Sequence, residues 1–102
     1  MRFSIRFTEE ARDDLAWLYG WLLQRADGNS AVAERALQVI RDGIVVLQFA
    51  PLSCRKVSSS DPFLRELILG IGFSGYVLLY EVENSHTVTV LAARHQREDD
   101  FR

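Results

Sequence analysis

Residues 2–11 carry the sequence RFSIRFTEEA, in which the spacing of the apolar residues changes from every second residue to a helical repeat. Phe3, Ile5 and Phe7 alternate with polar residues, which predicts a half-buried strand over residues 2–7. Thr8 is a favourable N-cap, and two glutamates follow it at the positive end of the helix dipole. The stretch therefore predicts a strand that leads directly into a helix.

Two amphipathic helices are predicted from apolar residues that recur three and four positions apart. The first helix has one face made of Ala11, Leu15, Leu18 and Leu22. The second helix has the same spacing at Ala33, Leu37, Ile40, Ile44 and Leu47. Asp27-Gly28-Asn29 separates the two patterns, and Asn29 or Ser30 is placed to cap the second helix. Together these features predict a helical hairpin.

The second half of the chain is predicted to form a loop and then three strands. Residues 50–63 contain two prolines and a run of serines, which favours a loop. Strand-like runs follow at about 64–70, 76–83 and 87–94, and glycines in the first gap predict a β-turn. Such short gaps favour antiparallel neighbours. We therefore expect one domain over residues 1–102 with an α+β fold of order β-α-α-β-β-β, in which the helical hairpin packs on a mainly antiparallel small sheet.

Composition narrows the function classes. The net charge of −2 disfavours a broad nonspecific grip on nucleic acid. Cys54 is the one cysteine, and the two histidines, His86 and His95, have no metal-ligand spacing, so we expect neither a metal nor a cofactor. No apolar run approaches the length of a membrane span, and residues 1–6 lack a signal-peptide pattern. We therefore expect a cytoplasmic protein that binds no membrane.

Two groups of residues are candidates for binding sites. Trp17 and Trp21 lie beside the apolar face of the first helix, where they form either additional core or an exposed surface for a partner. Arg94, His95 and Arg97 follow one another at the end of the last strand and form either a contact site or a solvated face.

Arg65 and Glu66 are neighbours on a predicted strand. Adjacent strand residues point to opposite faces of a sheet, so we expect no catalytic pair there. Arg65 or Glu66 is instead placed to pair across the sheet with Tyr80 or Arg94.

Several strings in this order resemble the RelE/ParE toxin superfamily across nearly the whole chain. They are Ala11-Arg12-Asp13-Asp14-Leu15, Leu64-Arg65-Glu66-Leu67, Gly75-Tyr76-Val77-Leu78-Leu79-Tyr80-Glu81-Val82 and Val90-Leu91-Ala92-Ala93-Arg94-His95-Gln96-Arg97-Glu98. The RelE-like branch cleaves mRNA on the ribosome with cationic and polar side chains on the sheet. Here Val77, Ile68 and Gly70 stand where that branch has cations. The ending Arg94-His95-Gln96-Arg97 resembles the ParE-like branch instead, although an acidic stretch, Glu98-Asp99-Asp100, follows it.

The resemblance implies a ParE-like toxin, not an enzyme, that inhibits DNA gyrase and is neutralised by a cognate antitoxin. Trp17 and Trp21 are then candidates for antitoxin binding, and Arg94, His95 and Arg97 are candidates for target binding, with no direct sequence-specific binding of nucleic acid. Two alternatives stay open. One is a RelE-like ribosome-dependent mRNA endonuclease that uses Arg65, Arg94, His95 and Arg97; the other is a degenerate toxin that only binds its antitoxin.

Overall fold

The first strand and the first helix form where the change in apolar spacing predicts them. The computed structural model describes residues 2–25, 30–70 and 75–95. Strand β1 spans Ser4–Phe7 and helix α1 spans Glu9–Arg25. The backbone N–H of Ala11 donates to Oγ1 of Thr8 at 3.0 Å, which confirms Thr8 as the cap of α1. Helix α2 follows over Ser30–Phe49, and the predicted turn at 27–29 lies outside the described residues.

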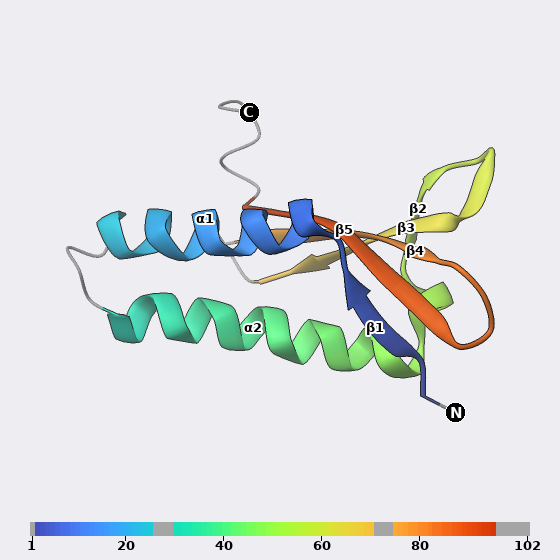
Figure 1. Ribbon diagram of the computed structural model, residues 1–102, viewed down its shortest axis with the longest axis horizontal. Helices are drawn as coiled ribbons and strands as arrows, with labels where there is room; N and C mark the ends of the chain where they lie inside the picture. Colours follow the sequence, from blue (N-terminus) through green and yellow to red (C-terminus); the bar gives the residue numbers. More distant parts are fainter. Residues whose placement is uncertain (1, 26–29, 71–74, 96–102) are drawn as a thin grey trace.

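Helices α1 and α2 lie side by side and cover one face of the sheet (Figure 1). Helix α2 approaches the sheet closely at Gly43, where a Cβ atom would lie 2.6 Å from Cδ1 of Leu69. Glycine therefore permits this close packing. Within the described ranges, neither α1 nor α2 combines the length and the apolar content that a membrane-spanning helix requires.

The core lies between the helices and the inner face of the sheet. Strand β4, Tyr76–Val82, buries every second residue on that face. The buried residues of the core are Ala11, Leu18, Ala36, Ile40, Leu47, Tyr76, Leu78, Tyr80, Val82, Val88, Val90 and Ala93.

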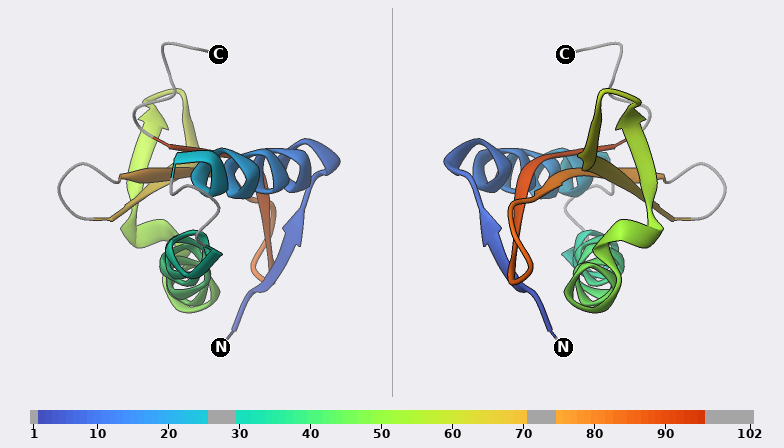
Figure 2. Two further views of the ribbon diagram at one scale, coloured as in Figure 1. Left: turned by 90° about the vertical axis from the view of Figure 1, so that its left-hand side faces the viewer. Right: turned by 90° about the vertical axis from the view of Figure 1, so that its right-hand side faces the viewer.

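Strand β2 spans Arg55–Ser58, β3 spans Asp61–Leu69 and β5 spans Thr87–His95. In the part of the chain that the structure describes, the sheet has five strands in the order β1-β5-β4-β3-β2. The pairs β2–β3, β3–β4 and β4–β5 are antiparallel, whereas β1 pairs in parallel with β5. Strand β5 therefore lies between β1 and β4, although β1 comes first in the sequence (Figure 2). The predicted α+β fold is confirmed.

The segment predicted to be a loop, residues 50–63, contains regular structure. A 3-10 turn covers Pro51–Ser53, strand β2 covers Arg55–Ser58, and β3 begins at Asp61 rather than near residue 64. The prediction missed β2 because an edge strand that is exposed on both faces has no alternation of apolar and polar residues. Pro62 is tolerated in β3 because it stands next to the first residue of the strand.

The turn between β3 and β4 begins at Gly70. Its φ of 102° lies in the left-handed region that glycine adopts without strain. Residues 71–74 of the predicted β-turn lie outside the described residues.

Candidate functional site

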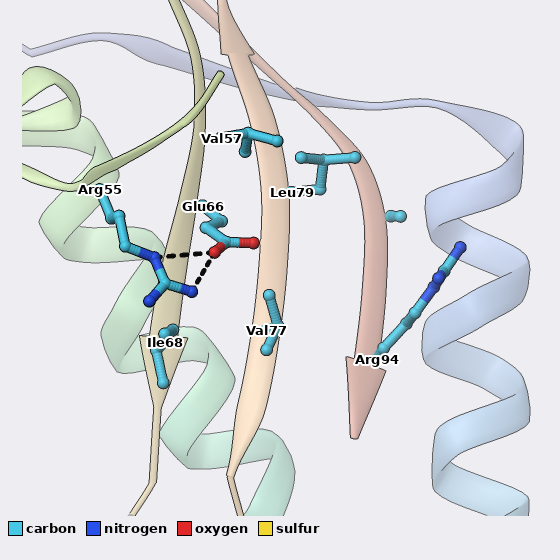
Figure 3. A pocket seen from close by; sticks show the side chains of 8 residues that line it. Arg55, Val57, Glu66, Ile68, Val77, Leu79 and Arg94 are labelled. Atoms are coloured by element: carbon cyan, nitrogen blue, oxygen red, sulfur yellow. Dashed lines mark hydrogen bonds and ion pairs between the residues drawn. The ribbon is translucent and has the colours of Figure 1, made fainter. Parts of the chain in front are cut away.

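The face of the sheet away from the core forms a shallow hollow, which we call the open face. Its volume is about 520 Å³. Strands β2, β3, β4 and β5 all contribute to it (Figure 3). The lining residues are Arg55, Val57, Glu66, Ile68, Val77, Leu79, Ala92 and Arg94. The centre of the hollow is therefore apolar, with charged side chains at its sides.

The charges of the open face are unequally partnered. Arg55 on β2 donates from Nε to the carboxylate of Glu66 on β3 at 2.9 Å and also forms an ion pair with it. Arg94 lies across the hollow on β5, and its side chain points away from the Arg55–Glu66 pair (Figure 3). Within the described ranges Arg94 forms no ion pair and is exposed to solvent. Among the described residues that line the hollow, Arg94 is thus the cation without an ion-pair partner, and it stands beside an apolar floor.

The other two cations predicted beside Arg94 cannot be placed with it. His95 is the last residue of β5 and pairs with Tyr76 in the backbone register, but its side chain is outside what the structure describes. Arg97 lies outside the described residues altogether. Of the predicted cluster, Arg94 is the residue that the structure assigns to the open face.

Arg65 lies on the other face of β3 from Glu66, as the alternation of strand side chains predicted, so the two side chains do not converge in one pocket. Its Nη1 donates to the backbone carbonyls of Leu52 and Cys54, both at 2.9 Å. In the backbone register Arg65 lies opposite Tyr80, a core residue. Arg65 therefore ties the 50–54 segment to the sheet, and the structure does not bring it together with Arg94.

Trp17 and Trp21 form a stacked pair on α1. Their ring centroids are 6.1 Å apart and their planes differ by 16°. Trp17 is 47% exposed, whereas Trp21 is half-buried and packs against the core. Trp21 therefore anchors the pair to the core, and Trp17 leaves an aromatic surface exposed. Exposed aromatic surfaces of this kind are common in binding sites.

A family model for the ParE toxin of the type II toxin–antitoxin system parDE matches residues 5–100. The chain belongs to the ParE toxin family. A relative from Caulobacter vibrioides named Toxin RelE3 is 35% identical over 96 residues, which are 93% of this chain and 96% of the relative. The fold resembles a solved chain described as the chromosomal ParDE TA system from P. aeruginosa. That match has a TM-score of 0.71 and 21% identity over 92% of this chain and 96% of the other.

This ParE-family chain also has features that the sequence analysis missed. Asp14 is only 8% exposed and accepts a hydrogen bond from the backbone N–H of Ala93 at 3.1 Å. Its position three residues after Ala11 and four before Leu18, on the buried side of α1, is a signal that the sequence did contain.

A second missed feature is a buried phenol. The hydroxyl of Tyr80 donates to the backbone carbonyl of Pro51. Burial raises the pKa of Tyr80 above its ordinary value, and a hydrogen bond with Cys54 acts in the same direction. Nothing in the local sequence indicates this contact, because its partners are 29 residues apart.

No metal site emerges from the part of the ParE-family fold that the structure describes. Within residues 2–25, 30–70 and 75–95, no three His, Cys, Asp or Glu side chains come together as ligands.

Proposed function

We propose that this ParE-family toxin acts by binding DNA gyrase through its open face and is neutralised by a cognate antitoxin. The observation that supports binding rather than catalysis is the lining of the hollow. Cleavage of RNA requires groups that move protons and cations that stabilise the charge on phosphate. In the hollow, Glu66 and Arg55 neutralise each other, and Arg94 is the remaining cation. Ile68, Val77 and Leu79 form an apolar floor that suits a protein surface better.

Arg94 is our candidate for the central target contact. An exposed arginine beside an apolar floor is typical of residues that dominate protein interfaces. His95 and Arg97 follow it in the sequence, and we assign them to the same contact.

The antitoxin is proposed to bind α1 at Trp17 and Trp21. Antitoxin segments that fold on binding often place an amphipathic helix against an apolar surface. The stacked indoles provide such a surface without requiring the core to open. Because gyrase and the ribosome are both cytoplasmic, we place the protein in the cytoplasm.

Two assays on one preparation separate the possible targets. The first measures supercoiling by gyrase and gyrase-dependent DNA cleavage with ATP; the second measures mRNA cleavage on programmed ribosomes. We expect inhibition in the first assay and intact mRNA in the second. Arg94→Glu should raise the concentration needed for half-inhibition by about tenfold or more, because reversing an interfacial charge typically costs more than ~1.4 kcal/mol. Arg41→Glu, a matched change at an exposed arginine of α2, should leave inhibition unchanged.

Each contrary result has a defined meaning. The relative named Toxin RelE3 makes a ribosome-dependent endonuclease the alternative to exclude. Codon-phased mRNA cuts with gyrase unaffected would establish that alternative. Inactivity in both assays with tight antitoxin binding would identify a degenerate toxin that only binds its antitoxin.

A further inference from the structure

Strand β5 contains one extra residue relative to its neighbour β4. Leu79 pairs with Ala92, but the next residue, Tyr80, pairs with Val90. Leu91 is therefore a β-bulge, an unpaired residue inserted into the antiparallel ladder.

The bulge changes which residues of β5 face the core: residues with even numbers do so before it, and residues with odd numbers do so after it. Before it, Val88 and Val90 point into the core; after it, Ala93 does. Side chains on a regular strand alternate with a period of two, so without the extra residue Arg94 would follow Val88 and Val90 into the core. With the extra residue, Arg94 stands beside Val77 on the open face. The position of Arg94 thus depends on the bulge.

Two side chains of the α1 region bind the backbone of β5, one at the bulge and one two residues after it. The register of β1 with β5 ends at Phe7 and Val90, so the buried backbone groups of β5 beyond that pair require other partners. The Oγ1 of Thr8 donates to the carbonyl of Leu91 at 3.3 Å. A carboxylate oxygen of Asp14 accepts from the N–H of Ala93 at 3.1 Å. Thr8 and Asp14 therefore bind β5 on both sides of Ala92.

We propose that Asp14 and Thr8 are positioning residues that hold the Leu91 bulge and thereby place Arg94 on the open face. The functional part of this inference rests on the proposed role of Arg94 in gyrase binding. Burying a carboxylate is unfavourable unless it is well hydrogen-bonded, so its presence in the packed face of α1 needs a specific partner. The N–H of Ala93 is such a partner, and a charge-assisted bond to it is stronger than one between neutral groups. Thr8 adds a second role, because the same oxygen caps α1 and fixes the helix relative to β5.

The test compares substitutions at two adjacent aspartates of α1. Asp14→Leu replaces the acceptor with an apolar side chain, and Asp14→Asn keeps an oxygen at similar volume that can accept from Ala93. Asp13→Leu makes the matched change at an exposed position. Amide hydrogen exchange and cross-strand contacts between Arg94 and Val77, both followed by NMR, report on the bulge directly. Gyrase inhibition and antitoxin affinity are measured on the same samples.

We expect Asp14→Leu to exchange the Ala93 amide at least about tenfold faster, as loss of a hydrogen bond to a charged group predicts. The same variant should lose the Arg94–Val77 contacts and inhibit gyrase about tenfold less well, with antitoxin affinity within about threefold of the parent. Asp14→Asn should recover most of the Arg94–Val77 contacts and most of the gyrase inhibition. Asp13→Leu should resemble the parent protein.

The inference and the proposed function can fail separately. Unchanged exchange at Ala93 with Arg94 still opposite Val77 in Asp14→Leu would overturn the positioning role, whatever gyrase does. If the parent protein does not inhibit gyrase, the proposed target is wrong, while the NMR measurements still decide the role of Asp14. If Asp14→Leu does not fold, Thr8→Val and its conservative counterpart Thr8→Ser make the same comparison at Leu91. Loss of the Arg94–Val77 contacts in Thr8→Val with recovery in Thr8→Ser supports the inference, and their retention in both overturns it.

Discussion

Replacing Trp17 by alanine should weaken antitoxin binding about a hundredfold while the domain stays folded. A tryptophan side chain buries up to about 250 Å² when it is fully covered. With 47% of Trp17 exposed, roughly 120 Å² remains for a partner to cover. At about 25 cal/mol per Å², covering that area contributes ~3 kcal/mol, which corresponds to about a hundredfold in the dissociation constant.

The assay is titration calorimetry of each variant with the purified antitoxin, accompanied by urea unfolding. Phe49→Ala is the matched control, because Phe49 is an aromatic residue that is 58% exposed on α2 rather than α1. It should bind the antitoxin as the parent protein does. Trp21→Ala should weaken binding and also lower stability, since Trp21 packs on the core. Binding of folded Trp17→Ala within about threefold of the parent would refute the assignment, because a covered indole contributes more than that.

Three further predictions concern stability, measured by urea unfolding. Gly20→Ala should stabilise the protein by about 1 kcal/mol, because a Cβ there meets nothing within 4 Å and alanine favours the helix; a loss would show that the site is not open. Tyr80→Phe should cost about 1–2 kcal/mol at pH 8. That difference should shrink by up to ~1.4 kcal/mol per pH unit above pH 10, because the unfolded tyrosine then ionises while the folded one, with its raised pKa, keeps its proton; a constant difference would contradict this. Glu66→Gln should change stability by less than about 1 kcal/mol, since its partner Arg55 is largely exposed, and a larger loss would mean that the pair is structural.

The elements that the sequence predicts are those with a regular apolar repeat. Strand β1, both helices and strands β4 and β5 bury one side against the core, so their spacing is visible in the residue types. Strand β2 has no such side and was missed. The parallel pairing of β1 with β5 was also not predicted, because it joins segments that are far apart and depends on how the helices pack.

The candidate site was predicted in part. The position of Trp17 beside the apolar face of α1 left its exposure undecided, and the structure shows it half exposed. Arg94 was correctly placed at the end of the last strand. The face of the sheet on which Arg94 lies could not be predicted from the sequence. The two-residue alternation of side chains that starts at Val88 and Val90 would place Arg94 in the core, and nothing in Leu91-Ala92-Ala93 indicates a one-residue bulge.

The contacts between β1, α1 and β5 have a consequence for the time course of synthesis. Thr8 and Leu91 are 83 residues apart in the chain. At about 5–20 residues per second, β5 leaves the synthesis site roughly 4–17 s after the residues that must bind it. During that interval β1 has no strand beside it, and Asp14 lacks the hydrogen bond that it later accepts from the N–H of Ala93. Helix α1, with its indoles, is therefore made several seconds before the strand that presents Arg94, and the sheet closes in a late, long-range step of the kind that slows folding.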